Sequence, residues 1–410
     1  MENVTWKQNL KVVWFAEFLG ALGISACLPF LALYVRELGV SDDAEAQTWA
    51  GIIYSASFLF SALLTPFWGA LGDKFGRKLM LLRAYVGVGL LSALMGLVTS
   101  VEQLFILRLL QGTVSGFVAS SIALVAATTP AMHAGWALGL LQTSLSAGNI
   151  IGPLIGGLCA DFLGMRPAFF LVAGLCLVSA VIIYIFANET NGQSTSKLES
   201  QAPKGVIDNF KTAFADPAFG RIVLLMFLAM LGLTATQPVL AFYVEELHAP
   251  KQYVGTVTGA LVGLIGILGI IFAPFWGRQS DAQGMHRILK SAVVVLSLTA
   301  LLQAVVPHYW YLFPLRAAQG VFSAGILPLL FAALSQRASP ERRGGLIALG
   351  SSATMLAQCV APTSGGWLAS HWGIPWTFVL SALIFAIMLP LLSRLPVNQN
   401  DSSSSTARAD

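Results

Sequence analysis

Residues 65–78 read TPFWGALGDKFGRK, and residues 273–285 read APFWGRQSDAQGM. The Pro, Phe, Trp, Gly and Asp of the first stretch recur in the second, from Pro66 and Pro274 to Asp73 and Asp281. Self-similarity at a fixed period is decisive for architecture, because each copy folds into the same structural unit. The chain therefore consists of two related halves.

The composition is that of an integral membrane protein. Of the 410 residues, 56% are hydrophobic and 10% are charged, and the mean hydropathy is +0.75. A soluble domain averages roughly a quarter charged residues, and a helix needs about 20 apolar residues to cross a bilayer. We predict twelve such helices, near 12–35, 48–70, 79–99, 102–127, 136–162, 168–188, 219–245, 253–277, 287–306, 309–336, 344–371 and 375–395.

The placement of the basic residues predicts the orientation. Of the 23 Lys and Arg residues, Arg36, Arg166 and Lys251 fall in loops on one side, and Arg108 and Arg316 fall within helices. The remaining 18 share the side of both termini, which is therefore cytoplasmic by the positive-inside rule. The net charge of +4 then faces an anionic inner leaflet, so it does not indicate nucleic-acid binding.

The repeat extends well beyond the opening stretch. LPFLALYVREL at 28–38 returns as QPVLAFYVEEL at 237–247, and Arg108 with Gln111-Gly112 returns as Arg316 with Gln319-Gly320. We expect an N-terminal six-helix bundle at 1–188, a cytoplasmic linker at 189–218, a C-terminal six-helix bundle at 219–396 and a disordered cytoplasmic tail at 397–410. Two such halves related in parallel are typical of secondary transporters.

A first motif fills the cytoplasmic turn between the second and third helices. Its residues are Gly69, Asp73, Gly76, Arg77 and Lys78, with Asp281 in the second copy. Gly76 suits a tight turn, and Asp73 can accept hydrogen bonds from the N-terminus of a facing helix. The stretch resembles the signature loop of the major facilitator superfamily, which implies a twelve-helix all-α membrane fold and a latch between the halves. The alternative is a plain positive-inside loop.

A second motif lies in the fifth helix, with Gly148, Gly152, Pro153, Gly156 and Gly157. Three of these glycines are four residues apart, which makes a flat groove for a neighbouring helix. The run resembles the antiporter motif of the drug:proton antiporters in this superfamily, and it implies export. Small residues at this spacing also occur in ordinary helix packing, which is the alternative.

Arg108 lies inside the fourth helix, where a charge is costly and indicates function by default. With Leu104, Gln111 and Gly112 it resembles the helix-4 motif of the superfamily, which implies a role for Arg108 in proton coupling. The alternative is an arginine that snorkels to the surface or bonds helix carbonyls. Arg316 has the same setting in the second half.

Glu17 lies well inside the first predicted helix, twelve residues before Pro29. An acid in lipid must be neutral, paired or hydrated, so Glu17 is a candidate for binding a proton and, when ionised, a cation. Some bacterial multidrug:proton antiporters have a Glu at this spacing, which implies a part in proton and cationic-drug recognition. The second acid of those relatives is absent. Alternatively, Glu17 is salt-bridged or faces the inner vestibule.

Duplication also predicts where a substrate binds, namely near the midplane between the halves. The polar and aromatic candidates are Tyr34, Tyr54, Gln142, Asn149, Gln237, Tyr243 and Gln358. Asn149 and Gln358 are favoured because they are related by the repeat.

The chain has no motif of an enzyme, a metal site or a nucleotide cofactor. We expect a proton-coupled antiporter, acting as a monomer in the bacterial cytoplasmic (inner) membrane, that exports small amphipathic drugs. Its partners are the small-molecule substrate, protons and the lipid bilayer. The main alternative is a dedicated exporter of a metabolite, such as a siderophore or a sugar. The helix-5 run argues against an importer driven by proton symport, and a membrane enzyme or receptor is the alternative of a different class.

Overall fold

The computed structural model describes residues 2–188, 217–337 and 343–394. Within these ranges, the side chains of residues 2–5, 65, 66, 69, 70, 73, 131 and 343–345 lie outside the described part. The predicted tail at 397–410 and nearly all of the predicted linker at 189–218 fall outside the ranges as well. The predicted bounds of the two bundles therefore stay predictions.

The described residues form helices and no strand. The first half contains α1 (Glu2–Cys27), η1 (Leu28–Phe30), α2 (Leu31–Glu37), α3 (Asp43–Phe75), α4 (Arg77–Met95), α5 (Val101–Val114), α6 (Phe117–Thr128), α7 (Ala131–Leu163) and α8 (Met165–Phe186). The second half contains α10 (Pro217–Thr234), η2 (Gln237–Val239), α11 (Leu240–Glu246), η3 (Lys251–Tyr253), α12 (Val254–Gln283), α13 (Met285–Gln303), η4 (Tyr309–Tyr311), α14 (Leu312–Ser323), α15 (Ile326–Arg337), α16 (Arg343–Trp372) and α17 (Pro375–Ser393). Together they make 12 spans that are long and apolar enough to cross a membrane, as predicted.

Four of the predicted spans are interrupted, at equivalent places in the two halves. Pro29 and Pro238 lie in the short 3-10 turns η1 and η2, which divide the first and seventh spans. Proline removes a backbone donor and so weakens a helix at that point. The fourth span is divided before α6 at Gly116, whose φ of 113° only glycine adopts readily, and the tenth is divided between α14 and α15. The sequence predicts each of these spans as one continuous run.

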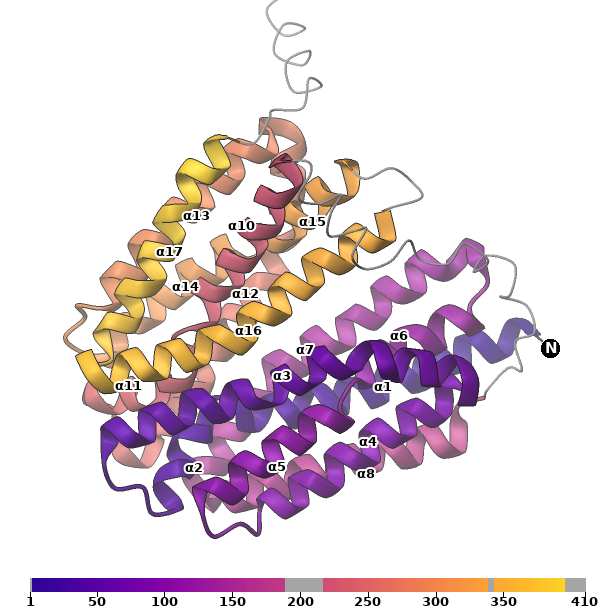
Figure 1. The fold of residues 1–410 in the computed structure, drawn as a ribbon, viewed down its shortest axis with the longest axis horizontal. Coiled ribbons are helices and arrows are strands. Elements are labelled where there is room, and N and C mark those ends of the chain that lie inside the picture. The colour runs from indigo at the N-terminus through magenta and orange to yellow at the C-terminus, as the bar shows by residue number, and fades with distance from the viewer. Residues whose placement is uncertain (1, 189–216, 338–342, 395–410) are drawn as a thin grey trace, which may run out of the picture.

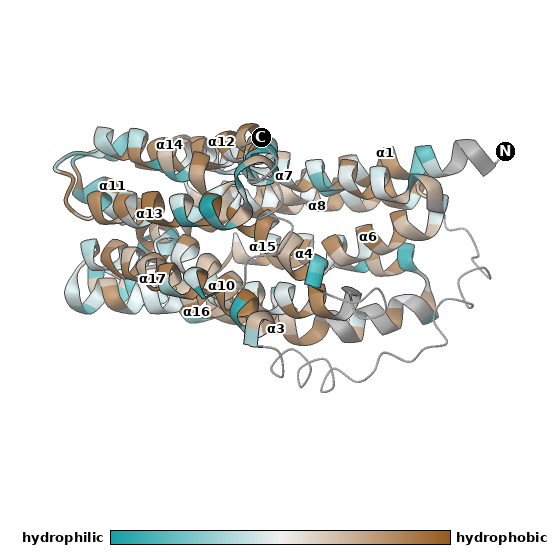
Figure 2. Cartoon of the chain, turned by 90° about the horizontal axis from the view of Figure 1, so that it is seen from above, coloured by the Kyte–Doolittle hydropathy of each residue, from teal (hydrophilic) through white to brown (hydrophobic). Residues whose placement is uncertain are grey.

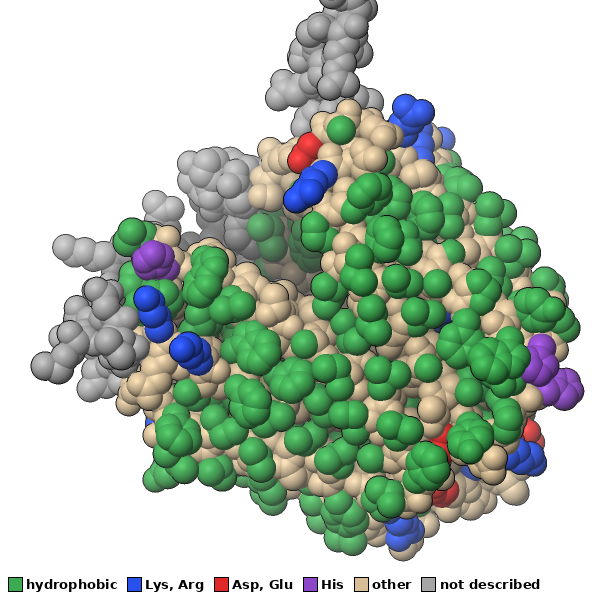
Figure 3. Space-filling view, turned by 180° about the vertical axis from the view of Figure 1, so that it is seen from behind, with side chains coloured by type: hydrophobic (Ala, Val, Ile, Leu, Met, Phe, Trp, Pro, Cys, Tyr) green, Lys and Arg blue, Asp and Glu red, His purple; other side chains and the backbone are tan. Residues whose placement is uncertain are grey.

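The surface of the molecule is largely apolar. Figure 3 shows apolar side chains over most of one face, with charged side chains mainly at its margins. Large side chains such as Leu63, Phe162 and Tyr184 are more than 60% exposed. Figure 2 shows apolar residues in every labelled helix. A surface of this kind is stable in hydrocarbon, where helices satisfy their own backbone hydrogen bonds.

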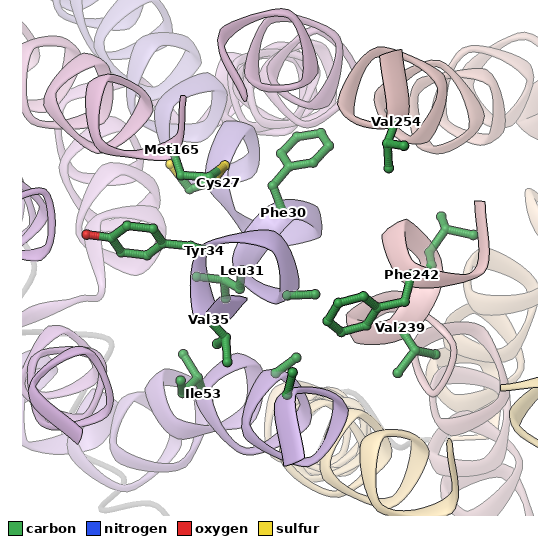
Figure 4. Close-up of a cluster of buried hydrophobic side chains, with 14 of the residues drawn as sticks. Cys27, Phe30, Leu31, Tyr34, Val35, Ile53, Met165, Val239, Phe242 and Val254 are labelled. Carbon is green, nitrogen blue, oxygen red and sulfur yellow. The ribbon is translucent and has the colours of Figure 1, made fainter. Parts of the chain in front are cut away.

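The two halves share one apolar core at one end only. Figure 1 shows the halves meeting where α2 and α11 lie and diverging from there. At the meeting end, Phe30 and Leu31 of the first half belong to the same buried cluster as Val239 and Phe242 of the second (Figure 4). The other two clusters each belong to a single half. We call the shared end the closed end.

Small residues let the halves approach closely at the closed end. A Cβ at Gly51 in α3 would overlap the carbonyl oxygen of Pro362 in α16, and one at Gly259 in α12 would overlap that of Pro153 in α7. Gly259 and Pro362 follow Gly51 and Pro153 by the repeat spacing, so the two contacts are copies of each other. The interface is therefore pseudo-symmetric.

Candidate functional site

A cavity of about 680 Å³ opens between the halves on the side away from the closed end. Side chains of α1, α3, α4, α5 and α6 form its first-half wall, and α16 contributes Ala348, Ser351, Ser352 and Met355. Most of the lining is apolar, including Phe58. A mostly apolar cavity of this size with a few polar groups is typical of sites for small organic molecules.

Arg108, on α5, lines this cavity together with Gln111 and is only 5% exposed. Its Nη1 donates to Oε1 of Gln111 at 2.6 Å, and its Nε donates to the carbonyl of Ile53 at 3.4 Å. Among the described residues, its third nitrogen makes no hydrogen bond. The side chain bonds a backbone carbonyl and also lines the cavity, and its predicted role in proton coupling stays a prediction.

Arg316 does not repeat this arrangement. It is fully buried, and none of its three side-chain nitrogens has a hydrogen-bond partner among the described residues. Its guanidinium carbon lies 5.9 Å from the centre of the Phe378 ring. The lining of the cavity does not include it, so the two arginines differ in exposure despite their equivalent sequence positions.

Glu17 is buried between α1 and α7, at 1% exposure, and does not line the cavity. Oγ of Ser144 donates a hydrogen bond of 3.1 Å to its Oε2. No Lys or Arg pairs with Glu17 in the part of the chain that the structure describes. Both alternatives from the sequence, a salt bridge and a place in the open vestibule, are therefore unsupported.

Two further polar groups lie close to Glu17. The Tyr85 ring packs against Gly20, and the Tyr85 hydroxyl lies beside the hydroxyl of Ser121. Tyr85 is near enough to Glu17 for the two side chains to interact electrostatically. Glu17, Tyr85, Ser121 and Ser144 come from four helices, so the carboxyl lies in a polar cluster inside the first half.

The helix-5 motif has two faces, each in contact with a different helix. A Cβ at Gly148, Gly152 or Gly156 would collide with α1, at Ala21, Ser25 and Ala26. On the other face, the backbones of Pro153 and Gly157 touch Gly259 and Gly255 of α12. One run of residues therefore packs within its own half and across to the other.

The stripe toward α1 continues to Glu17. Ser144 precedes Gly148 by four residues, the same spacing that separates Gly148 from Gly152. On α1, Glu17 likewise precedes Ala21 by four residues. The buried carboxyl thus lies at one end of the contact between α1 and α7 that the antiporter-like glycines make possible.

The aromatic candidates do not line this cavity. Tyr34 is fully buried and donates to the carbonyl of Met95 at 2.7 Å, and Tyr243 donates in the same way to the carbonyl of Gln303. Tyr54 stacks on Phe58, with ring centres 6.1 Å apart, and only Phe58 lines the cavity. All three are held by contacts with neighbouring helices or with their own helix, and their predicted part in substrate binding stays a prediction.

The amide candidates also lie outside the lining. Asn149 on α7 is exposed, whereas Gln358 on α16 and Gln237 on η2 are half-buried. None of the three belongs to the cavity. Their predicted part in substrate binding therefore stays a prediction.

The gate motif is described in part. The side chains of Gly69 and Asp73 lie outside the described residues. Gly76 ends α3 with a φ of 101°, as the turn requires. The Lys78 ammonium donates to the carbonyls of Tyr184 and Ala187 at the end of α8.

The two basic residues and the second-copy acid differ in setting. Arg77 donates to the carbonyl of Ala123, in the middle of α6, at 3.2 Å. Lys78 is a cation at a helix C-terminus, where positive charge is stabilised, and both residues make their described contacts within the first half. Asp281, in the second copy, is exposed.

Polar ties across the closed end escaped the sequence analysis. The Asp161 carboxylate at the end of α7 accepts from the backbone N–H groups of Gly255 at 2.8 Å and Thr256 at 2.6 Å, at the start of α12. The Arg36 side chain pairs with Glu245, also across the halves. The opposite charges at equivalent repeat positions were visible in the sequence, but nothing in it placed them side by side.

Comparisons with known proteins agree with this architecture. A family model described as Major Facilitator Superfamily matches residues 13–301 and 222–409. The chain is 34% identical over 385 residues to the multidrug resistance protein MdtG of Proteus mirabilis, a match that covers 93% of this chain and 94% of that protein.

Two solved structures show the fold alone. A bacterial homologue of the human lysosomal transporter Spinster has a TM-score of 0.75 at 13% identity, covering 95% of this chain and 96% of its own. The nucleoside transporter NupG has a TM-score of 0.76 at 12% identity, covering 94% of this chain and 98% of its own. The predicted pair of pseudo-symmetric six-helix bundles is thereby confirmed.

Proposed function

We propose that this chain, which belongs to the Major Facilitator Superfamily and is a transporter rather than an enzyme, exports small amphipathic drugs or toxic compounds. The observation that carries the proposal is the mostly apolar cavity of about 680 Å³ between the two halves. The resemblance to relatives named multidrug resistance proteins supports the same substrate range. A cavity with few polar groups selects by size and apolar surface more than by one specific shape.

Proton coupling is the second part of the proposal, with Glu17 as the proton-binding group. Its burial and its hydrogen bond to Ser144 support this role, since an intramembrane acid without a cation partner is a functional candidate. Direct contact with a cationic drug has no support, because Glu17 is not part of the cavity wall. We propose that Arg108, in the cavity wall, takes part in coupling proton binding to substrate binding.

Alternating access follows from the same geometry. We propose that the closed end faces outward and that the cavity opens to the cytoplasm, with both termini on that side of the bacterial inner membrane. The distribution of Lys and Arg supports this orientation. Substrate and proton shift the two states only by binding them with different affinity.

The remaining sequence-based roles are proposals of the same kind. We propose that the loop from Gly69 to Lys78 latches the halves when the cytoplasmic side is closed, through Asp73, and that Asp281 makes the weaker equivalent contact. We also propose that the protein works as a monomer of two bundles joined by a cytoplasmic linker.

A resistance panel in an efflux-deficient bacterial host tests the function. We expect expression to raise tolerance of several structurally unrelated amphiphiles, and we expect a proton uncoupler to remove that tolerance. The D73N variant should insert normally but transport slowly. Tolerance of one metabolite only would favour the rival reading, a dedicated exporter of a siderophore or a sugar.

A further inference from the structure

One aromatic ring lies between the buried carboxyl of Glu17 and the wall of the cavity. A Cβ at Gly20, three residues after Glu17 on α1, would lie 2.6 Å from the Tyr85 ring. The centre of the same ring lies 5.3 Å from that of Phe117, which lines the cavity. Residues three apart on a helix are neighbours on one face. Tyr85 therefore contacts both the turn of α1 that carries Glu17 and a residue of the cavity wall.

The polar groups around Glu17 are hydroxyls. Ser144 on α7 donates to its Oε2 at 3.1 Å, and Ser179 on α8 donates to the backbone carbonyl just before it at 3.0 Å. Tyr85 on α4 is close enough to Glu17 to interact electrostatically, and Ser121 on α6 lies beside the Tyr85 hydroxyl. Each of the four helices thus contributes one hydroxyl group to the cluster.

Charged groups lie elsewhere on the helices around this carboxyl. The one other titratable side chain in the cluster is Cys176 on α8, which acts on Tyr85 and is neutral at neutral pH. How tightly Glu17 holds its proton therefore depends on hydroxyl donors. The remaining charged or titratable side chains of these helices are placed as follows: Lys7 and Lys11 of α1 are exposed, His133 of α7 stacks on Trp6, Arg77 and Lys78 of α4 bind carbonyls of Ala123 and Tyr184, Arg83 of α4 stacks on Trp68, Asp161 of α7 binds the start of α12, and Arg166 of α8 binds the carbonyl of Val98.

The Tyr85 hydroxyl has more acceptors near it than protons to give. A tyrosine hydroxyl has a single proton, so it donates to one acceptor at a time. Two acceptors lie near it, the hydroxyl oxygen of Ser121 and the carboxylate of Glu17. A buried carboxylate is costly unless it is hydrogen-bonded, and a donor makes its stronger bond to a charged acceptor. Since Ser144 is the one donor to Glu17 among the described residues, the ionised form would gain from a second.

We propose that Tyr85 controls how tightly Glu17 holds its proton, by turning its hydroxyl from Ser121 to the carboxylate when Glu17 ionises. This inference rests on the proton-binding role proposed for Glu17 above and names a second residue at the same site. Tyr85 is a positioning residue, because it acts on the proton only through Glu17. Its ring packs on Phe117, so the switch lies next to the cavity wall while Glu17 itself stays buried.

Infrared difference spectroscopy tests the proposal on the full chain in phosphatidylcholine nanodiscs, without any transported substrate. The signal is the carboxyl stretch of protonated Glu17, identified as the band that E17Q lacks. Its loss is followed from about pH 5 to about pH 10, a range that covers documented buried carboxyl groups. The midpoint of this titration is the quantity compared among variants.

Two variants should move the midpoint in opposite directions. Y85F keeps the ring and removes the hydroxyl, so the ionised form loses its second donor and we expect the midpoint to rise by about one pH unit, a proton held about tenfold more tightly. S121A removes the competing acceptor, so Tyr85 serves Glu17 more fully and the midpoint should fall. General loosening of the packing would instead move both variants in the same direction.

Each variant has a matched control. Y309F removes the hydroxyl of another buried tyrosine, which lies in the second half. S120A alters the serine next to Ser121 on α6, and adjacent residues of a helix do not face the same neighbours. Both controls should keep the wild-type midpoint. A wild-type melting temperature shows that Y85F and S121A are folded.

The results separate this inference from the function on which it rests. A wild-type midpoint in Y85F or in S121A, or shifts of both in the same direction, would remove the role of Tyr85 and leave proton binding by Glu17 standing. A wild-type band that does not titrate anywhere in the range would overturn the proton-binding role of Glu17 as well.

Discussion

Arg36 and Glu245 occupy the same position in the two sequence repeats, and their side chains form a salt bridge with each other. The first lies in LPFLALYVREL and the second in QPVLAFYVEEL. Residues related by a two-fold axis meet only if they lie close to that axis. The pair therefore marks where the pseudo-two-fold axis passes through the closed end. Because the two equivalent residues carry opposite charges, they attract each other across the axis.

The Arg36–Glu245 salt bridge should stabilise the contact of the two halves at the closed end by a modest amount. The two side chains are 31% and 25% exposed, so we expect a coupling of about 0.5 kcal/mol, reduced by solvent screening. A double-mutant cycle with R36Q and E245Q measures this coupling. The quantity compared in the cycle is the alkylation rate of Cys159, in a C359S background. Cys159 packs against the shared core. The matched control is the cycle of R36Q with D43N, since the Arg36–Asp43 pair lies within one half; equal coupling in both cycles would contradict the assignment.

Asp161 should stabilise the contact of the two halves at the closed end more than the Arg36–Glu245 bridge does. Its carboxylate accepts two backbone N–H groups at the start of α12, where the helix dipole favours an anion by up to about 2 kcal/mol. D161N keeps one acceptor oxygen, so we expect the alkylation rate of Cys159 to rise roughly tenfold. Ser370 is the equivalent residue in the second half, and among the described residues its hydroxyl bonds only within its own helix α16, to Trp367 and His371. S370A should leave the rate unchanged, and an unchanged rate in D161N would remove the proposed tie.

Glu17 and Ser144 should act together in proton coupling. In everted vesicles, we expect E17Q to lower the rate of efflux driven by a pH gradient at least about tenfold, because the side chain can no longer gain or lose a proton. Substrate exchange without a gradient should persist, since Glu17 does not touch the cavity.

S144A should displace the pH profile of efflux, because it removes the one hydrogen bond that Glu17 accepts in the described structure. S146A is the control, since that hydroxyl bonds only within α7. Gradient-driven efflux in E17Q at the wild-type rate and pH dependence would show that the proton binds elsewhere.

The contact between α1 and α7 should be sensitive to a single methyl group. G156A places a Cβ against the backbone of Ala26, so we expect a loss of about 1–3 kcal/mol in stability and a lower melting temperature in detergent. G139A is the control on the same helix, because nothing lies within 4 Å of a Cβ there. It should be neutral or gain up to about 1 kcal/mol from helix propensity. Equal melting temperatures for the two variants would contradict the close packing.

The sequence predicted the helix-5 motif more fully than the cavity. Gly148, Gly152 and Gly156 are four residues apart, and the helical period alone puts them on one face. The sequence does not say, however, that the helix packed against this face is α1, because that depends on the tertiary arrangement of the helices. The cavity was predicted between the halves, but Asn149 and Gln358 were expected in its wall because they are related by the repeat. Equivalence in sequence says nothing about which face is turned to the cavity in a given state.

The chain's own pattern determined that it crosses the membrane in two related sets of six helices, because apolar length and repetition are local properties of the sequence. It also showed that Glu17, Arg108 and Arg316 are charges within helices. Only the tertiary structure decided that Glu17 is buried in the first half, that Arg108 lines the cavity and that Arg316 is buried with no hydrogen-bond partner among the described residues. Burial and charge balance depend on neighbours distant in sequence, and packing of the helices is what brings those neighbours together.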